Sequence, residues 1–227
     1  MDIQKELFAL GEEEYRLFQQ KLTPGLSPDC FLGVRVPALR ALEKRCRGSA
    51  EAEAFRAALP HKYYDENLLH SVMISNMRDK AGVMAALDAF LPYVDNWAVC
   101  DTLRPSVFRR EKEGLYERIV GWIASDLPYV SRFGMDMLMT FYLDADFESD
   151  QLALPLTAKS DDYYVRMMQA WYYATALAKQ WDDTLPYLTE RRLPPWIHNK
   201  TIMKARESFR VSPAHKELLL SLRIAER

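Results

Sequence analysis

The chain has 227 residues, of which 49% are hydrophobic and 27% charged, with a formal net charge of −2 at pH 7. That length allows a substantial buried core, and the near-neutral average gives no indication of nucleic-acid binding by the chain as a whole. No run of about 18 apolar residues and no signal-peptide pattern occurs, so we expect a cytoplasmic protein without a membrane span. The three cysteines lack CxxC spacing, so we expect neither a disulfide framework nor a zinc site.

Apolar residues recur at helical spacing through most of the chain, and short breaks with Pro, Asp, Asn or Gly separate these segments. Only eight glycines occur, and long alternating β-branched runs are missing. The sequence therefore predicts an all-α protein. Its clearest helical segments are AGVMAALDAFLPYV (81–94), GLYERIVGWIASDL (114–127), RFGMDMLMTFYL (132–143) and VRMMQAWYYATALAK (165–179).

Three segments align without gaps at a period of 34 residues: YVSRFGMDML (129–138), YYVRMMQAWY (163–172) and IHNKTIMKAR (197–206). Helical pairs at this period are typical of a HEAT- or armadillo-like repeat, in which each pair packs only against its neighbours. We therefore expect residues 1–227 to form a single domain, a curved α-solenoid. The predicted partner helices are 81–91, 114–125, 150–158 and 183–190.

The same period places three cations at equivalent positions, Arg132, Arg166 and Lys200. In a stacked solenoid such positions form a ladder along one face, and a ladder of cations can follow the backbone of a polyanion. Ordinary salt bridges one helical turn away, from Arg132 to Asp136 and from Arg166 to Asp162, are the alternative.

Charge is unevenly distributed along the chain. Residues 190–227 contain nine Lys and Arg against four Asp and Glu, whereas the preceding residues are acidic, with 21 against 28. A basic C-terminal end is compatible with an anionic partner, although a solvated basic tail is the commoner meaning of such a pattern.

The stretch YVDNWAVCDTL (93–103) places Trp97 and Asp101 one helical turn apart, so both point to one side of a helix. An unpaired carboxylate is costly in a core, and an exposed helix has little need of a tryptophan. The pair therefore indicates a half-open surface that contacts a ligand. The alternative is a local salt bridge from Asp101 to Arg104.

Five segments in chain order carry a family resemblance: FLGVRVPALRALEK (31–44), YVDNWAVCDTL (93–103), YVSRFGMDMLM (129–139), YYVRMMQAWYYATALAK (163–179) and PWIHNKTIMKARES (195–208). Together they resemble the bacterial DNA alkylation repair family, the AlkD-type DNA glycosylases with HEAT-like repeats. The resemblance covers about residues 12 to 215 and implies an enzyme that excises cationic N3- and N7-alkylated purines from duplex DNA. It implies no cofactor and no metal, and we expect a monomer.

The resemblance assigns catalytic roles to Trp97, Asp101, Arg132 and Trp171. Asp101 would stabilise the cationic sugar and could position a water, the two tryptophans would pack against the sugar and backbone, and Arg132 would hold a phosphate. The family's N-terminal aromatic residue has no clean equivalent, which leaves Tyr15 and Phe18 as candidates.

A second phosphate-binding cluster is predicted where a helix opens near residue 197, because amide dipoles at a helix start favour anions. The predicted DNA-binding residues are Arg166, His198, Asn199, Lys200, Lys204, Arg206 and Arg210.

Two interpretations of function follow. The first is an alkylpurine DNA glycosylase, and the second is a non-catalytic solenoid that binds DNA or a protein through its concave face. Tryptophans on helices are generally core residues, and we interpret Trp122, Trp181 and Trp196 as packing.

Overall fold

The computed structural model describes residues 1–225, and every regular element within that range is a helix. This confirms the predicted all-α class. The predicted basic segment 190–227 extends two residues beyond the described part of the chain. The helices form two compact units, Met1–Glu111 and Lys112–Arg227. None of the helices described is both long and apolar enough to cross a membrane.

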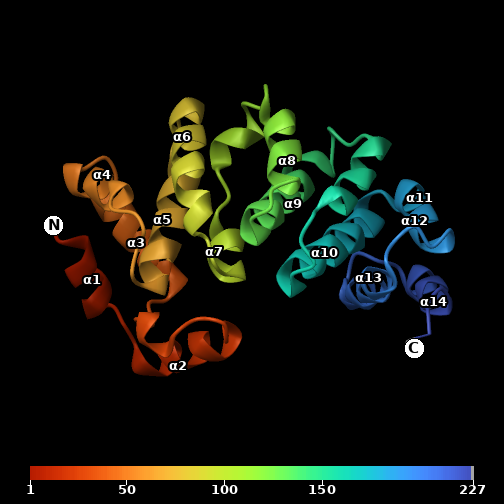
Figure 1. Ribbon diagram of the computed structural model, residues 1–227, viewed down its shortest axis with the longest axis horizontal. Coiled ribbons are helices and arrows are strands. Elements are labelled where there is room, and N and C mark those ends of the chain that lie inside the picture. Colours follow the sequence, from red (N-terminus) through yellow and green to blue (C-terminus); the bar gives the residue numbers. More distant parts are fainter. Residues whose placement is uncertain (226–227) are drawn as a thin grey trace. The chain divides into compact units, whose positions relative to one another are not determined.

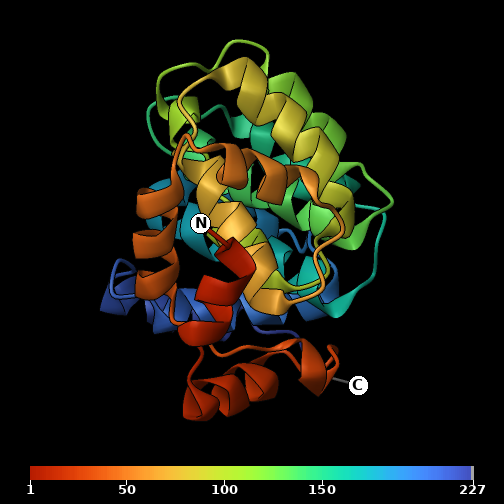
Figure 2. The same ribbon diagram turned by 90° about the vertical axis from the view of Figure 1, so that its left-hand side faces the viewer.

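The first unit contains α1 to α7 (Figure 1), and the shortest of these helices, α7, begins at Trp97. Helix α2 lies on the opposite side of this unit from α6 in both views (Figures 1 and 2). In chain order the elements are α1 (Ile3–Ala9), α2 (Glu13–Leu22), the 3₁₀ turn η1 (Pro28–Cys30), α3 (Val36–Cys46), α4 (Ala50–Ala57), α5 (Tyr64–Asn76), α6 (Lys80–Phe90), η2 (Leu91–Tyr93), α7 (Trp97–Thr102) and η3 (Ser106–Arg109).

Helix α5 forms the core of the first unit, with its first eleven residues all buried. It packs against α3 on one side and α7 on the other, with α1 and α6 also in contact. A helix that neighbours cover on all sides has little amphipathic pattern, which explains why YDENLLHSVMISN carries apolar and polar residues all round.

The polar residues of α5 hold the neighbouring loop in place. The buried Asp65 carboxylate accepts hydrogen bonds from the backbone N–H groups of Leu32 (2.7 Å) and Val34 (2.8 Å). Burial raises the pKa of Asp65, and these hydrogen bonds oppose the rise. Gly33 between them has φ +83°, and a Cβ there would lie 2.3 Å from the Glu12 carbonyl oxygen. Only glycine fits this turn of the FLGV segment.

The second unit contains the three segments that align at the 34-residue period. They form the helices α9, α10 and α13, and α10 packs against both of the others. The elements of this unit are α8 (Leu115–Ile123), α9 (Pro128–Tyr142), η4 (Ser149–Thr157), α10 (Tyr163–Lys179), α11 (Trp181–Thr184), α12 (Pro186–Thr189), α13 (Pro195–Glu207) and α14 (Pro213–Ser221).

The predicted partner helices are partly confirmed. Segments 81–91 and 114–125 correspond to α6 and α8. Segment 150–158 is a 3₁₀ helix and not an α-helix, since Pro155 lies inside it and has no N–H to donate. Segment 183–190 is divided into α11 and α12, and α12 begins at Pro186.

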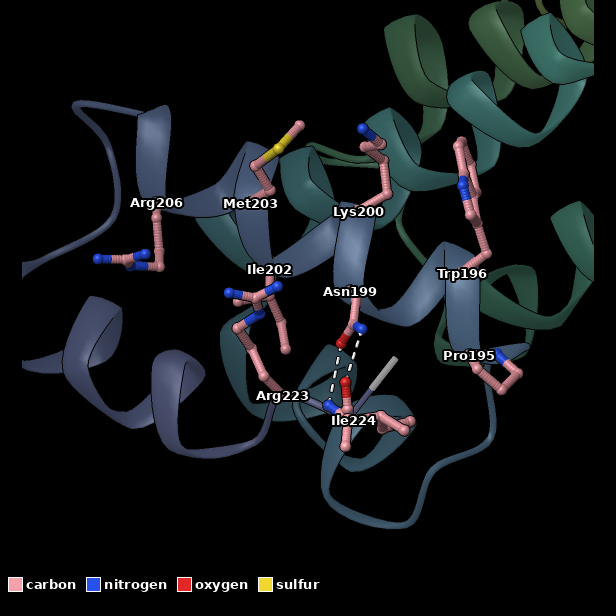
Figure 3. Close-up of a pocket in the computed structure, with 10 residues that line it drawn as sticks. Pro195, Trp196, Asn199, Lys200, Ile202, Met203, Arg206, Arg223 and Ile224 are labelled. Carbon is pink, nitrogen blue, oxygen red and sulfur yellow. Dashed lines mark hydrogen bonds between the residues drawn. The ribbon is translucent and has the colours of Figure 1, made fainter. Parts of the chain in front are cut away.

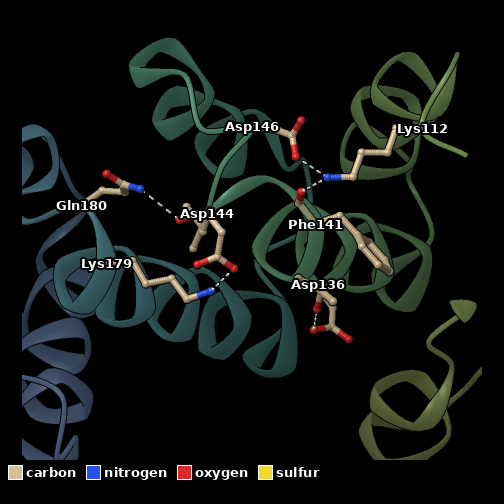
Figure 4. Close-up of polar contacts among 9 residues, drawn as sticks. Lys112, Asp136, Phe141, Asp144, Asp146, Lys179 and Gln180 are labelled. Atoms are coloured by element: carbon tan, nitrogen blue, oxygen red, sulfur yellow. Dashed lines mark hydrogen bonds and ion pairs between the residues drawn. The ribbon is translucent and has the colours of Figure 1, made fainter. Parts of the chain in front are cut away.

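Side chains from outside α9 donate hydrogen bonds to carbonyl groups at its C-terminal end (Figure 4). They come from the segments just before α8 and just after α10. Lys112 Nζ donates to the Phe141 carbonyl oxygen at 2.8 Å and also pairs with Asp146. Gln180 Nε2 donates to the Leu143 carbonyl oxygen at 3.1 Å. The last carbonyl groups of a helix lack partners within it, so these contacts fix where α9 ends.

Candidate functional site

Trp97 and Asp101 both lie on α7, as the sequence predicts, and both are half-buried. The helix starts at Trp97 because Asn96 caps it: the Asn96 side chain accepts from the Val99 N–H at 3.0 Å. The i and i+4 positions place the indole and the carboxylate on the same face of this short helix.

The indole of Trp97 is hydrogen-bonded to α2, a helix much earlier in the sequence of the first unit. Its Nε1–H donates to the carbonyl oxygen of Leu22 at 3.1 Å. Leu22 is the last residue of α2, so the hydrogen bond uses a carbonyl that the helix itself leaves without a partner. The ring of Trp97 is therefore oriented by α2 as well as by α7.

Helix α2 also carries the two candidate N-terminal aromatic residues. Tyr15 and Phe18 stack on each other with ring centroids 5.8 Å apart, and Phe18 is 51% exposed. The Arg35 guanidinium lies 4.6 Å from the centroid of the Tyr15 ring. Tyr15 is half-buried, and Arg35 also pairs with Glu12 at 2.9 Å, so part of its charge is offset. Both aromatic candidates remain predictions.

Arg132 lies in the second turn of α9 and is only 5% exposed. Its Nη1 donates to the Tyr164 carbonyl oxygen in α10 at 2.6 Å. This bond joins two successive repeats. The guanidinium is therefore at least partly a structural link, which the sequence does not reveal.

Trp171 lies on α10, half-buried, and lines a pocket of about 360 Å³ between α10 and α13. Lys204 and Arg210 line the same pocket. Lys204 also pairs with Glu207 at 3.1 Å, so part of its charge is offset there. The second unit thus places one candidate catalytic tryptophan beside two of the predicted DNA-binding cations.

The two other cations of the predicted ladder lie around a tryptophan that the sequence analysis assigned to packing. Trp196 opens α13, and its ring centroid lies 4.7 Å from the Arg166 guanidinium carbon and 5.4 Å from Lys200 Nζ. Asp162, the alternative partner of Arg166, instead caps α10 by accepting from the Tyr164 N–H at 2.7 Å. No ion pair joins Arg166 to Asp162 in the described residues.

The His198 and Asn199 side chains contact the backbone of the segment that follows Ser221, instead of facing solvent as the predicted DNA contact requires. His198 is fully buried, and its Nε2 lies 2.9 Å from the Leu222 carbonyl oxygen. Burial lowers its pKa, which favours the neutral ring. The Asn199 amide makes two hydrogen bonds with the backbone of Ile224, as Figure 3 shows. The buried His198 ring has no surface to offer a phosphate in this structure.

The remaining predicted cations, Arg206 and Arg210, are both exposed. Arg206 lines a second pocket of α13, together with Lys200 and Trp196. The other two tryptophans assigned to packing are confirmed in that role: Trp122 is 6% exposed, and Trp181 stacks on His215 with ring centroids 3.6 Å apart. Trp196 is the functional candidate that the sequence analysis missed. The signal for it was its i, i+4 spacing from Lys200.

No group of three or more His, Cys, Asp or Glu side chains that could hold a metal ion occurs within residues 1–225. The candidate residues themselves are aromatic rings, cations and one carboxylate. Such a set can bind a polyanion and can stabilise positive charge next to it.

The family model described as DNA alkylation repair enzyme matches residues 3–202. The chain therefore belongs to the DNA alkylation repair enzyme family, and the matched part includes α1 through most of α13. Comparison with curated proteins gave no match, and comparison with solved structures gave none either.

Proposed function

We propose that the protein is a DNA glycosylase that excises cationic N3- and N7-alkylated purines from duplex DNA. Membership of the DNA alkylation repair enzyme family supports a role in alkylation repair. The observation that carries the more specific proposal is the geometry of α7, in which Trp97 and Asp101 share one half-exposed helical face.

The chemistry of the lesion determines what the enzyme must supply. Alkylation at N3 or N7 gives the purine a positive charge, so the base leaves readily without a strong general acid. Positive charge then develops on the deoxyribose as the glycosidic bond breaks. A fixed carboxylate beside that sugar stabilises the transition state more than the ground state, and this difference accelerates the reaction.

Asp101 supplies this carboxylate in the proposed mechanism, and it can also orient the attacking water. Trp97 provides an aromatic surface for the sugar, and its hydrogen bond to Leu22 keeps the ring in a fixed orientation. In the second unit, Trp171 is the other aromatic residue of the proposed set and lies next to the cations Lys204 and Arg210. Aromatic faces favour a cationic lesion over a neutral base.

The proposed phosphate contacts come from the second unit. Arg166, Lys200, Lys204, Arg206 and Arg210 supply exposed or half-exposed positive charge on α10, on α13 and just after it. Arg132 is buried, and its hydrogen bond to the Tyr164 carbonyl oxygen joins α9 to α10, the helix that carries Arg166. His198 and Asn199 hold the chain that packs against α13.

Incubation of the protein with duplex DNA that contains a single 7-methylguanine tests the proposal. We expect abasic sites, detected as strand breaks after alkaline treatment, and none in the same duplex with an unmodified guanine. A protein that binds this DNA but releases no base under single-turnover conditions would not be a glycosylase for this lesion.

Non-catalytic binding of DNA or a protein through the same residues is the second candidate function. The burial of Arg132 and its bond to the Tyr164 carbonyl favour it, because a guanidinium used to join repeats contributes less to a catalytic centre. This candidate predicts affinity for the alkylated duplex equal to that for the undamaged one, without base release.

A further inference from the structure

A pocket of about 610 Å³ opens along α13 and is distinct from the one that Trp171 lines. Figure 3 shows Trp196, Lys200 and Met203 projecting from one side of the helix, while Asn199 points towards Ile224. A volume of this size is in the range of small-ligand sites. Its walls combine an aromatic ring, apolar side chains and cations, and its lining residues include no carboxylate.

Two of the pocket's cations have no carboxylate partner within the described residues. Neither Lys200 nor Arg206 forms a salt bridge or a side-chain hydrogen bond there. By contrast Lys204, on the same helix, pairs with Glu207. Positive charges that face a cavity without compensation attract an anion from solution.

Trp196 presents an aromatic surface beside these cations. The Arg166 guanidinium lies over the ring, 4.7 Å from its centroid, and Lys200 Nζ lies over it at 5.4 Å. Tyr163 packs edge-on against the ring with centroids 5.9 Å apart. The indole N–H has no acceptor in the part of the chain that the structure describes. A flat ligand stacked on this ring would take the place of Lys200 over it, and the flexible stem of that lysine would keep its ammonium group within reach of the ligand's own anionic group.

The far wall of the pocket is built by the segment after α14. Asn199 Nδ2 donates to the Ile224 carbonyl oxygen at 2.8 Å, and Asn199 Oδ1 accepts from the Ile224 N–H at 3.0 Å. This pair of bonds holds the backbone of residue 224 against α13, so that Ile224 lines the pocket. The wall is therefore fixed, and fixed walls reduce the entropic cost of binding.

We propose that this pocket binds an unpaired nucleotide of a DNA strand, with the base on Trp196 and its phosphate at Lys200. Stacking on aromatic residues beside a positive groove is how single-stranded nucleic acids are bound without sequence preference. A bare phosphate would leave the apolar walls formed by Ile202 and Met203 uncovered. A paired base in a duplex is already stacked and has no face to offer.

The inference deepens the proposed function, because it rests on DNA as the substrate and adds the class of DNA that binds best. A glycosylase with such a pocket would bind strand ends, gaps or extruded nucleotides next to a lesion more tightly than continuous duplex. The pocket would then hold the unpaired nucleotide while the residues of the proposed catalytic set act elsewhere on the strand.

Fluorescence anisotropy with undamaged probes tests this pocket separately from excision. The labelled probes are a blunt duplex and the same duplex with a short thymidine overhang at the 3′ or 5′ end. Free thymidine monophosphate is the unlabelled competitor. We expect the overhang duplex to bind more tightly than the blunt duplex. The monophosphate tests whether a single nucleotide is enough to occupy the pocket. Its competition with the overhang duplex supports a preformed nucleotide pocket. Equal competition by inorganic phosphate overturns the role of the base.

Trp196→Ala should remove the preference for the overhang. We expect it to weaken overhang binding by about five- to 150-fold more than blunt-duplex binding, which corresponds to about 1–3 kcal/mol for one stacked base. Trp196→Phe keeps a ring and should retain most of the preference. Equal loss for both duplexes in Trp196→Ala overturns the proposal.

Met203→Glu provides a second test that leaves the packing of Trp196 in place. Met203 is 40% exposed and lines the pocket, so a carboxylate there should repel the phosphate and abolish the overhang preference without unfolding the protein. Leu218→Glu is the matched control, because Leu218 on α14 is 42% exposed and lies outside the lining. A preference that survives Met203→Glu, or is lost equally in Leu218→Glu, overturns the pocket assignment.

The failure of this inference differs from a failure of the proposed function. Base release from the 7-methylguanine duplex with equal affinity for blunt and overhang probes overturns only the pocket. An overhang preference that depends on Trp196, without any base release, overturns only the glycosylase.

Discussion

Trp97 and Asp101 lie on one face of the short helix α7, and the Trp97 indole donates a hydrogen bond to the Leu22 carbonyl oxygen at the end of α2. Helix α7 contributes Val99 and Cys100 to the core, whereas Trp97 and Asp101 stay half-buried. We propose that this half-exposed ring and carboxylate also contact the DNA substrate, in addition to the structural bond of Trp97. The distinction is experimental, because a structural role and a catalytic role predict different losses.

Asp101→Asn preserves the size and polarity of the side chain but removes its charge. If the carboxylate stabilises a developing sugar cation, excision should fall by roughly ten- to a thousandfold, or about 1.4–4 kcal/mol of transition-state stabilisation. Binding to undamaged duplex should stay similar or tighten slightly, since one repulsion with phosphate is lost. Single-turnover excision and the melting temperature are measured on the same preparation.

The structural alternative, a local salt bridge from Asp101 to Arg104, predicts a different pattern. The melting temperature of Asp101→Asn would drop while excision per folded molecule stayed intact. Trp97→Ala serves as the comparison, because loss of the ring should weaken both binding and excision. Full activity in the Asp101→Asn protein would leave the pair without a catalytic role.

A pair of histidines in the first unit makes stability depend on pH. His61 Nε2 and His70 Nδ1 lie 2.8 Å apart, and the His70 ring stacks on Phe90 with centroids 4.1 Å apart. Burial, and then the charges of His61 and Arg56, lower the pKa of His70 to about 3. Burial lowers the pKa of His61 as well.

The sign of the effect follows from which state binds the proton. In the unfolded chain His70 takes up a proton near its ordinary pKa of 6.5, while in the folded chain it stays neutral down to about 3. The unfolded state therefore gains protons first, and stability should fall from pH 7 downwards by about 2 kcal/mol at pH 5 for this group. Urea unfolding across that range measures it. His70→Phe should show a shallower pH dependence, and identical slopes in both proteins would contradict the assignment.

Two glycines of neighbouring helices differ in what surrounds them. A Cβ on Gly134 of α9 would lie 2.7 Å from the backbone nitrogen of Ile123 at the end of α8, whereas a Cβ on Gly121 of α8 would meet nothing within 4 Å. Of these two glycines, only Gly134 is required by the close approach of α8 and α9.

Gly134→Ala should therefore destabilise the protein by about 1–3 kcal/mol, because the added methyl group forces the two helices apart. Gly121→Ala is the matched control: the same methyl group in an open helical position should stabilise by about 0.4–1 kcal/mol. Chemical denaturation of the two variants measures both values. A Gly134→Ala protein as stable as the wild type would show that α8 and α9 can separate without cost.

For the individual helices, the sequence predicts well where they lie in the chain. It predicts poorly which distant segments pack against them. The 34-residue period locates α9, α10 and α13, since apolar spacing depends on local geometry. His198 was predicted to bind phosphate because it opens a basic helix, but the segment around Leu222 covers it, and that contact spans 24 residues. The spacing of Trp196 to Lys200 is a local signal, but its contact with Arg166 on α10 and the pocket beside it depend on tertiary packing that local spacing does not predict.

For the molecule as a whole, the uneven charge distribution matters more than the net charge of −2. The acidic residues are concentrated before residue 190, and the lysines and arginines proposed to bind DNA are mostly on α13 or just after it. A duplex would be repelled by much of the chain and attracted by this region. Its affinity should therefore depend strongly on salt, because each neutralised phosphate releases a counterion.

The slope of log K against log salt counts those phosphate contacts. For blunt duplex DNA it changes by about 0.9 for each contact, so Lys200→Ala and Arg206→Ala should each reduce its magnitude by that amount if each binds one phosphate. Lys5→Ala is the control, since it removes the same charge from the exposed surface of α1 in the first unit. It should shift affinity slightly through net charge and leave the slope unchanged. Unchanged slopes in Lys200→Ala and Arg206→Ala would exclude α13 from the duplex contact, and an equal change in all three proteins would mean that the slope reports total charge and not a defined interface.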